Sequence, residues 1–444
     1  TEGNNLGIGS NALGGPIAGG EFNVAIGNSS LDALTSADAN TAVGYQAGTA
    51  ITTGGQNTFL GRKAGDAATT PNNVIAIGDN AFGGGANVGC NYNIAIGNES
   101  MSTATMDHSG GGVTGLYNTC IGHFSATDIT SGAFNVVVGY ETGQNITSGT
   151  QNTFLGRVAG GANTTGNVNI AIGDGAYDGA DTESNNVAVG VNALGGAIDG
   201  GEFNVAVGNT ALDAVTSGDN NTAIGYQSLT DVTTGGDNTA VGFNSLPNVL
   251  AGTDNTGLGI DAGSSITGGS ANICIGSGAN VADAAQDFGI AMGFEITAAA
   301  NDFSFGKTSN VVTNDFDADA NWSRSSDERL KTNITNIDWK ALDFINELRP
   351  VTFNWKASQD VSNTMVEHNP NKNLMNTTVT IDGLIAQEVK SAMDKHNINN
   401  FGGWKERQNN EDKEKTQTLS KEAFVMPLIK AVQELSATVT TLQQ

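Results

Sequence analysis

The sequence is poor in basic residues, proline and cysteine, and it lacks long apolar runs. Its 19 Lys and Arg stand against 45 Asp and Glu, and such an acidic balance repels the phosphate backbone of nucleic acids. With 6 prolines and 61 glycines, a collagen-like or proline-rich chain is excluded. No stretch approaches about 18 consecutive apolar residues, and the first residues show no signal-peptide pattern. We therefore expect neither nucleic-acid binding nor membrane insertion.

The negative charge is confined to one part of the chain. Residues 1–320 hold 4 Lys and Arg against 29 Asp and Glu, a formal charge of −25, whereas residues 321–444 hold 15 against 16. This abrupt change indicates a domain boundary near residue 320. Solubility explains the acidity, and divalent-cation binding is the alternative, although no acidic motif has the spacing of a calcium-binding loop. No metal site and no cofactor are expected.

The three cysteines form no recognisable ligand or disulfide pattern. Their number is odd, and no Cys-x-x-Cys is present. Cys120 and Cys274 stand where other repeats carry Ala or another small or apolar residue. We interpret both as packing residues rather than nucleophiles or ligands.

Residues 1–300 repeat one short unit. Its kernel is Asn-[Val/Thr/Ile]-[Ala/Phe/Gly]-[Ile/Val/Leu]-Gly, and most kernels are 17 residues apart. The kernel glycines are Gly9, Gly27, Gly44, Gly61, Gly78, Gly97, Gly122, Gly139, Gly156, Gly173, Gly190, Gly208, Gly225, Gly242, Gly259, Gly276 and Gly293. A fixed short period is typical of a solenoid. About 17 coils at a strand spacing of roughly 4.8 Å predict a rod of about 80 Å.

Each repeat is predicted to form two short strands and two turns. In one kernel, Val24 and Ile26 alternate with Ala25, as strand geometry requires. Glycine and asparagine supply the positive φ angles of tight corners. Because so short a coil encloses little core, we expect the chains to share their core in a trimer.

Two features depart from a plain shaft. One kernel spacing is 25 residues, and the insertion, within 101–115, holds Met106, Asp107 and His108. It is either a binding loop or a tolerated surface insertion. Aromatic residues that we expect to point outward form either a sugar-binding ladder or contacts between protomers: Tyr45, Phe59, Tyr140, Phe154 and Tyr226.

The kernels resemble the left-handed β-roll heads of trimeric bacterial adhesins, which repeat Asn-Ser-Val-Ala-Ile-Gly-type motifs. The resemblance covers residues 1–300, although the adhesin unit is usually somewhat shorter than 17 residues. It implies an elongated trimer that serves as an adhesive head or a spacer.

From residue 321 the composition becomes ordinary and helical signals appear. A helix capped by Asp338 is expected to stop before Pro350, with one apolar face formed by Ala341, Leu342, Ile345 and Leu348. A strand is expected at 351–356, and a strand end running into a helix at 383–395. The polar segments 357–377 and 405–418 are expected to be mobile.

The last segment has a heptad pattern. Apolar residues follow one another at spacings of 3, 4, 3, 4 and 3: Val425, Leu428, Val432, Leu435, Val439 and Leu442. Such an a/d seam predicts a short parallel coiled coil. The alternative is one amphipathic helix docked on its own domain, because fewer than three heptads are marginal alone.

The candidate for chemistry is the run Ser326-Asp327-Glu328-Arg329-Leu330-Lys331-Thr332-Asn333-Ile334. By its residues alone, it is either a helix N-cap followed by a solvated charge run or a Ser–Lys pair. In such a pair the serine is the nucleophile and the lysine is the general base, provided that burial lowers the lysine pKa.

This run resembles the opening of the intramolecular chaperone auto-processing domain that ends many phage tail fibres and endosialidase-type tailspikes. Three downstream pieces match in the same order: Leu348-Arg349-Pro350-Val351-Thr352-Phe353, Gly383-Leu384-Ile385-Ala386-Gln387-Glu388-Val389 and Pro427-Leu428-Ile429-Lys430-Ala431-Val432-Gln433-Glu434-Leu435. The resemblance covers residues 325–444. It implies that three such domains bring the chains together in register, which a repetitive array requires, and that each then cuts its own chain.

The resemblance also implies roles for the residues of the motif. Ser326 is the expected nucleophile, attacking the carbonyl of Ser325, and Lys331 is the expected general base. An N-to-O acyl shift followed by ester hydrolysis is one route, and other Ser–Lys schemes stay open. Asp327, Arg329 and Asn333 match the motif and are expected to have supporting roles. Self-cleavage is the one enzymatic activity expected.

The sequence thus predicts a mainly β protein. A trimeric β-roll or β-solenoid with coils of about 17 residues is expected at 1–300, a connector at 301–324, and a small α+β domain ending in a coiled-coil helix at 325–444. We expect a homotrimeric phage tail fibre or receptor-binding fibre in the virion. Its expected partners are a host surface glycan or protein and other tail proteins.

Two other classes of protein are weighed against this one. A tailspike depolymerase needs paired carboxylates in a groove, and acidic residues after kernel glycines, such as Asp79 and Asp174, form no convincing pair. A bacterial trimeric adhesin needs a C-terminal membrane anchor, which the residues up to Gln444 do not resemble.

Overall fold

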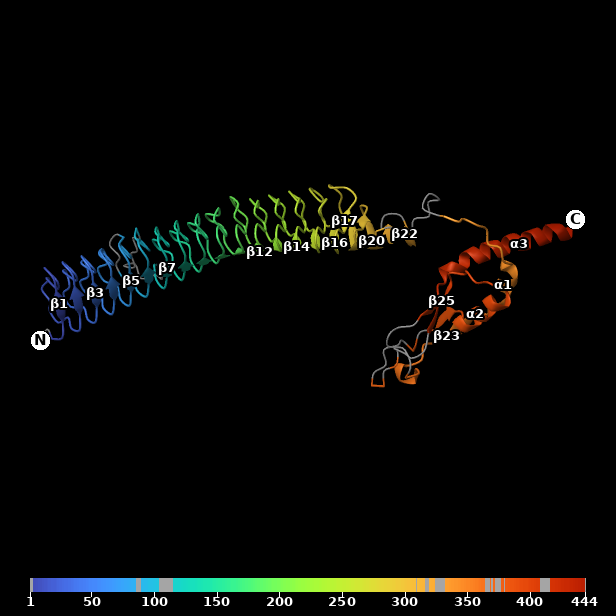
Figure 1. Cartoon of the computed structure of the whole chain (residues 1–444), viewed down its shortest axis with the longest axis horizontal. Helices are drawn as coiled ribbons and strands as arrows, with labels where there is room; N and C mark the ends of the chain where they lie inside the picture. The colour runs from blue at the N-terminus through green and yellow to red at the C-terminus, as the bar shows by residue number, and fades with distance from the viewer. Residues whose placement is uncertain are drawn as a thin grey trace. The chain divides into compact units, whose positions relative to one another are not determined.

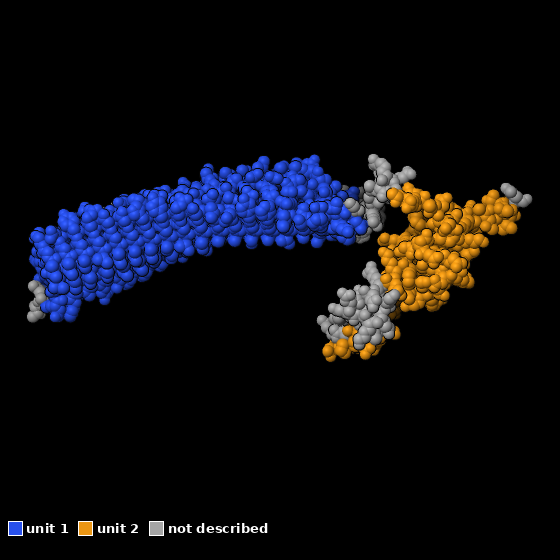
Figure 2. All heavy atoms as spheres, viewed as in Figure 1, with its two compact units in different colours: residues 1–325 blue, residues 326–444 orange. Residues whose placement is uncertain are grey.

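The computed structural model describes residues 3–84, 89–103, 115–308, 310–315, 319–323, 332–363, 368, 370–371, 377–378, 380–407 and 416–443. The chain divides into two compact units, Thr1–Ser325 and Ser326–Gln444, which are coloured separately in Figure 2. Each unit is described by itself below.

The first unit is a β-solenoid in which each repeat contributes one three-residue strand. These strands are β1 (Leu6–Ile8), β2 (Val24–Ile26), β3 (Thr41–Val43), β4 (Thr58–Leu60), β5 (Ile75–Ile77), β6 (Ile94–Ile96), β7 (Thr119–Ile121), β8 (Val136–Val138), β9 (Thr153–Leu155), β10 (Ile170–Ile172), β11 (Val187–Val189), β12 (Val205–Val207), β13 (Thr222–Ile224), β14 (Thr239–Val241), β15 (Thr256–Leu258) and β16 (Ile273–Ile275). Each pairs in parallel with the strand of the next repeat, so that Ala25 lies opposite Ala42. The coils stack into a gently curved rod (Figure 1). The predicted solenoid of 17-residue coils is confirmed.

The sheet continues beyond residue 300. β18 (Ile290–Phe294) and β20 (Asp302–Lys307) extend the parallel stack, and β21 (Asn310–Asp315) and β22 (Asp319–Ser323) then add antiparallel strands. Residues 302–306 (Asp-Phe-Ser-Phe-Gly) share only the final glycine with the kernel, although Gly306 lies opposite the kernel glycine Gly293. Part of the connector expected at 301–324 is therefore the end of the solenoid sheet.

The second half of each repeat is a turn region, not the second strand that the sequence predicts. Residues two positions after a kernel glycine adopt positive φ without being glycine, as at Gln46 (57°) and Lys63 (56°), and so leave strand geometry. Among the described residues, a second column of strands forms at the end of the solenoid, where β17 (Asn280–Val281) pairs with β19 (Thr297–Ala298).

The middle residue of each strand from β2 to β16 is buried, and in most coils its size is complementary to that of the residue six positions later. A Cβ on Gly160 would lie 2.4 Å from the ring of Phe154, so the glycine leaves the space that the ring fills. At Ala171 the strand residue is small and the later position carries a large side chain, Tyr177, which is also fully buried. Ala42 and Gly257 are exceptions, each followed by a glycine whose space side chains of neighbouring coils fill. This exchange of volume keeps the narrow core filled.

A ladder of buried asparagines follows the same stack. The backbone N–H and the Nδ2 group of Asn135 both donate to Oδ1 of Asn118, at 3.1 and 3.0 Å, and Nδ2 also donates to the Gly149 carbonyl at 2.8 Å. Equivalent contacts recur along the unit and satisfy polar groups that burial would otherwise leave unpaired. The ladder is interrupted at Val74, which keeps the backbone contact to Asn57 at 2.9 Å.

The second unit is a small α+β domain. Its elements are α1 (Ala341–Glu347), β23 (Val351–Phe353), η2 (Ser358–Asp360), β24 (Ile381–Gly383), α2 (Ala386–Lys395), β25 (Trp404–Arg407), β26 (Thr416–Leu419), η3 (Glu422–Phe424) and α3 (Val425–Gln443). β23 pairs with β24 and β25 with β26, both antiparallel. The segment 405–418, expected to be mobile throughout, thus contributes to a strand pair at both ends. No described helix is long and apolar enough to cross a membrane.

Candidate functional site

The predicted processing motif falls almost entirely where the structure gives no description. Its roles therefore stay predictions for the residues that lie outside the described ranges: Ser325, Ser326, Asp327, Arg329 and Lys331. Asn333 is described, exposed, and in the left-handed region with φ of 55°. Asparagine tolerates this region better than most residues, and the chain bends at Asn333, near the end of the motif.

An aromatic cluster anchors the chain just after the motif. The ring of Trp339 meets the buried ring of Phe344 edge to face, with centroids 5.3 Å apart. Phe344 meets Phe401 at 5.6 Å, and Phe401 meets Phe424 at 4.9 Å. These rings join α1, the chain before β25 and η3 in one core. The segment that leads from the motif to α1 is thus fixed at Trp339.

The structure brings together two of the sequence pieces that resemble the processing domain. β23 lies in the first piece, β24 ends at Gly383, the first residue of the second, and the two strands pair antiparallel with Val351 opposite Gly383. Arg349, from the first piece, forms an ion pair with Glu388, from the second. This contact lowers the pKa of the Glu388 carboxyl, and the contact with Lys395 lowers the pKa of Glu347. Both pairs are exposed, so they orient the elements more than they stabilise them.

A groove of about 1050 Å³ lies beside this strand pair. Its walls are largely apolar and include Phe353, Trp355, Leu384, Leu419 and Phe424. Lys421 crosses its edge and donates to the Asp382 carbonyl at 2.6 Å. Nothing among the described residues shows what the groove holds. Within the same ranges, no three His, Cys, Asp or Glu side chains form a group that can hold a metal ion.

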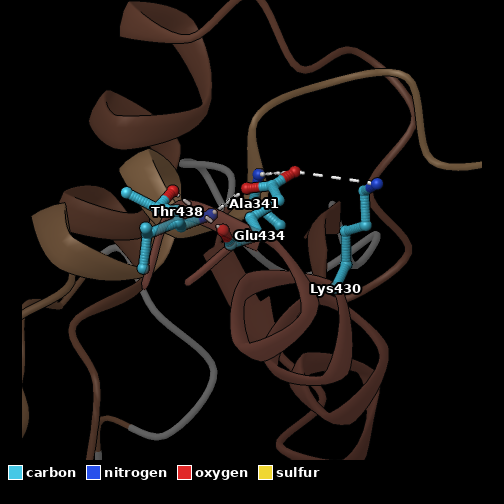
Figure 3. Close-up of polar contacts among 5 residues, drawn as sticks. Ala341, Lys430, Glu434 and Thr438 are labelled. Atoms are coloured by element: carbon cyan, nitrogen blue, oxygen red, sulfur yellow. Dashed lines mark hydrogen bonds and ion pairs between the residues drawn. The ribbon is translucent and has the colours of Figure 1, made fainter. Parts of the chain in front are cut away.

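The start of α1 is held by a side chain of the terminal helix α3. The expected cap, Asp338, does not have this role: the N-cap is Lys340, whose side chain makes no capping hydrogen bond. Instead, the Glu434 carboxylate of α3 accepts from the Leu342 N–H at 2.9 Å and from the Ala341 N–H at 3.4 Å (Figure 3). A carboxylate at this position satisfies free N–H groups and complements the helix dipole.

The terminal helix α3 has two different faces. Its buried residues are Pro427 and Ala431, which lie toward its own domain with Glu434. The predicted heptad seam lies on the other face and is between 44% and 82% exposed: Val425, Leu428, Val432, Leu435, Val439 and Leu442. The predicted helix is confirmed, and it packs on its own domain through Pro427, Ala431 and Glu434 while the seam itself is exposed. The coiled coil stays a prediction.

The solenoid also presents an apolar outer face. The third residue of every strand from β1 to β16 is Ile, Val or Leu, and none of these side chains is buried. Half-exposed aromatic residues flank this column, immediately before kernel asparagines or immediately after kernel glycines. The rings of Tyr92, Tyr117 and Phe134 form one stack, with centroids 5.0 and 5.2 Å apart. The sequence signal for this stack was that each of its aromatic residues directly precedes a kernel asparagine.

Only part of the expected set of outward aromatics is confirmed. Tyr45, Tyr140 and Tyr226 are about half exposed, at 51%, 47% and 47%. Phe59 and Phe154 are fully buried, because they occupy the inward middle position of their strands. The prediction that these two phenylalanines point outward is wrong.

Asp79 and Asp174 do not face each other. Each forms an ion pair with an arginine of the preceding coil: Arg62 with Asp79 and Arg157 with Asp174, both at 2.7 Å. They follow β5 and β10, so five coils, or about 24 Å, separate them along the stack. This is far beyond the separation of the two carboxyl groups in a glycosidase.

The remaining sequence candidates have plain structural roles or lie beyond the description. Cys90, Cys120 and Cys274 are buried, and burial raises the pKa of the Cys274 thiol to about 12 and that of Cys120 further. Cys120 and Cys274 are middle residues of strands, as their interpretation as packing residues predicts. The inserted residues Met106, Asp107 and His108 lie outside the described residues.

Comparison with known proteins assigns one part of the chain. The family model described as chaperone of endosialidase matches residues 326–398, which is 73 of 444 residues. No curated protein and no solved structure matches the chain. A chaperone-of-endosialidase domain following a β-solenoid of about 17 turns fits a protein of the tail-fibre or tailspike type.

Proposed function

We propose that this chain is one protomer of a homotrimeric phage tail fibre whose C-terminal unit aligns three chains and then cuts itself off between Ser325 and Ser326. The family match carries the proposal, because it begins at Ser326, the predicted nucleophile and the first residue of the second unit. A cut at this bond separates the two units without dividing either of them. The released fragment, 326–444, is the assembly domain, and the remaining fragment, 1–325, is the fibre.

Two exposed apolar surfaces support the trimer. The outer column of Ile, Val and Leu runs over sixteen rungs, or about 75 Å, whereas exposed apolar patches on monomers rarely exceed a few hundred Å². The heptad seam of α3 is the second surface. In the stack of Tyr92, Tyr117 and Phe134, both faces of the Tyr117 ring and the inner faces of the other two are covered, so a sugar cannot stack there. That arrangement favours contacts between protomers over a sugar-binding ladder.

The proposed chemistry needs one hydroxyl and one base. The Ser326 hydroxyl oxygen attacks the Ser325 carbonyl carbon while Lys331, in its neutral form, takes the hydroxyl proton. The peptide C–N bond breaks and the proton passes to the Ser326 amine, which leaves an ester. Water then hydrolyses the ester, giving a carboxylate on Ser325 and restoring the Ser326 hydroxyl. The products cannot easily re-form the uncut chain, so the fibre is kinetically trapped.

The proposed setting is the virion, with the fibre acting at the host cell surface. The receptor would be a surface glycan or protein, and other tail proteins would hold the fibre to the particle. The acidic solenoid is suited to neither nucleic acid nor an anionic membrane. No receptor-binding residue is assigned.

The test of this function follows the intact mass of freshly expressed full-length protein over time. We expect the wild type to yield fragments 1–325 and 326–444, and Ser326→Ala and Lys331→Ala to stay intact. Thr335→Ala, at an exposed position just after the motif, serves as the control and is expected to be cut normally. A trimeric wild type that stays uncut, or a Ser326→Ala variant cut at the same bond, would overturn the proposal.

A further inference from the structure

The helix that carries the predicted trimer seam also holds the start of α1. Counting the heptad from Val425 as position a, the seam occupies the a and d positions. Pro427 and Glu434 then fall at position c and Ala431 at position g, on the side that meets the domain. Because α3 is one continuous helix, a contact that fixes the position of its a/d side also fixes the position of its c/g side.

Glu434 is the polar link on that side. Its two carboxylate oxygens accept from consecutive N–H groups, those of Ala341 and Leu342 (Figure 3). Lys430, one turn earlier, lies with Nζ 3.8 Å from the same carboxylate and balances its charge. Glu434 is only partly exposed, and α1 has no capping side chain of its own. The first turn of α1 thus depends on a residue more than 90 positions away.

From α1 the link continues toward the processing motif. Trp339 packs edge to face on Phe344 of α1 and stands eight positions after Lys331. The chain between them therefore has a fixed end at Trp339. If α1 loses its cap, its first turn frays and this fixed end loosens.

We propose that Glu434 is a positioning residue for self-cleavage, which makes the reaction depend on the seating of the three heptad helices. The inference rests on the proposed function of the C-terminal unit and adds the route by which assembly reaches the cut. In a single chain the seam faces solvent, and α3 is held by Pro427, Ala431 and the Glu434 contact to α1. Assembly adds contacts along the seam, so the seated α3 keeps Glu434 on the start of α1 for more of the time and fixes the segment after the motif more firmly.

The test separates the rate within the trimer from the formation of the trimer. Cleavage of full-length protein is followed by intact mass over a range of protein concentrations. This gives a plateau rate constant and the concentration that gives half of it. For Glu434→Ala we expect a plateau rate about tenfold lower, because a charged cap bonded to two N–H groups is lost. We expect the half-maximal concentration to stay within about twofold of the wild-type value, because the seam is intact.

Two further variants sharpen the result. Glu434→Gln keeps one acceptor oxygen without the charge, so its plateau rate is expected to lie between the other two, about threefold below wild type. Gln433→Ala, an exposed neighbour outside both faces, is the matched control and is expected to cleave at the wild-type rate. If Glu434→Ala fails to assemble, the Glu434→Gln plateau rate decides.

Three outcomes would count against the inference. A Glu434 variant that keeps the wild-type plateau rate would overturn it. So would a slow variant whose rate returns to normal at high concentration, because Glu434 would then act on assembly alone. In both cases the wild type still cleaves, and the proposed function stands. A wild type that never cleaves overturns the proposed function as well.

Discussion

The two units of this chain obtain their structure in opposite ways. In the solenoid, each coil meets the coils before and after it, and the same contacts recur every 17 residues, as in the asparagine ladder. In the C-terminal unit, the decisive contacts join distant and unrelated residues, such as Leu342 and Glu434. A repeat stabilises itself rung by rung, but it does not specify which rung of another chain it should face. A non-repetitive unit has a single arrangement in which its contacts fit, so it can specify how it faces another chain.

This comparison agrees with the assembly role proposed for the C-terminal unit. Three solenoids that meet through similar apolar columns have many slipped alignments of nearly equal energy. A domain that assembles in one way removes that choice, and once the solenoids are paired it is no longer needed. The two units can also be observed separately, because all 6 tyrosines lie in the first unit and 3 of the 4 tryptophans lie in the second. The fourth, Trp322, belongs to β22 of the first unit, so the tryptophan measurements below use a Trp322→Phe background.

The largest effect is expected from disrupting the heptad seam of α3, through which the C-terminal units are proposed to assemble. Val432→Asp with Leu435→Asp places two charges per chain in the middle of the proposed three-helix seam, at a cost of several kcal/mol. We expect monomers in light scattering after size exclusion, and no cleavage. Gln433→Asp, between the two sites and off the seam, should remain trimeric. A double variant that still forms trimers would show that α3 does not hold the chains together.

A smaller effect is expected from disturbing the stacking of one solenoid coil on the next. Gly156 has a φ of 142°, and a Cβ there would lie 2.2 Å from the Gly173 carbonyl oxygen of the next coil. Gly156→Ala should therefore cost about 3 kcal/mol or more through backbone strain and this clash. The matched control is Gly268→Ala, where no heavy atom lies within 4 Å and the change should be nearly neutral.

Urea unfolding followed by tyrosine near-ultraviolet circular dichroism measures this difference. Tryptophan fluorescence, which reports the C-terminal unit, should not change between the two variants. Equal destabilisation by Gly156→Ala and Gly268→Ala would contradict the described stacking of kernel glycines.

The smallest effect is expected from pH: acidification should change the stability of the two units in opposite directions. Burial raises the pKa of Asp66, Asp178 and Asp213 in the solenoid, so the folded unit binds protons before the unfolded chain does. Its stability should rise as pH falls through these raised values toward the ordinary carboxyl pKa of about 4. In the C-terminal unit, basic partners lower the pKa of Glu347 and Glu388. That contribution is present above the ordinary value and is lost as pH falls through the lowered ones.

Urea unfolding at pH 7, 5 and 3.5 with the two spectroscopic probes tests this contrast. The tyrosine midpoint should rise on acidification while the tryptophan midpoint holds and then falls. Midpoints that fall together from pH 7 downward would contradict the contrast.

The periodic part of the fold could be predicted because one local pattern is repeated many times. The kernel placed the strands, the small middle residue and the coil length. The second strand was a wrong prediction, because residues such as Gln46 and Lys63 take positive φ that their chemistry does not announce. The outward direction expected for Phe154 was also wrong, because Gly160, six positions later, leaves the space that its ring fills.

The C-terminal site could be predicted only in pieces. The heptad spacing identified α3, and local patterns located α1, β23 and α2. The capping of α1 by Glu434 was beyond reach, because it depends on the packing of elements more than 90 residues apart. Asp338 was the better local candidate, yet the helix begins three residues after it.

The central claim is that the C-terminal unit assembles three chains and then leaves them. Native mass spectrometry of purified wild-type protein, with denaturing intact mass on the same sample, tests it most directly. We predict a complex of three copies of 1–325, with 326–444 present as separate fragments or absent. A monomer, or a trimer made of uncut 444-residue chains, would contradict the claim.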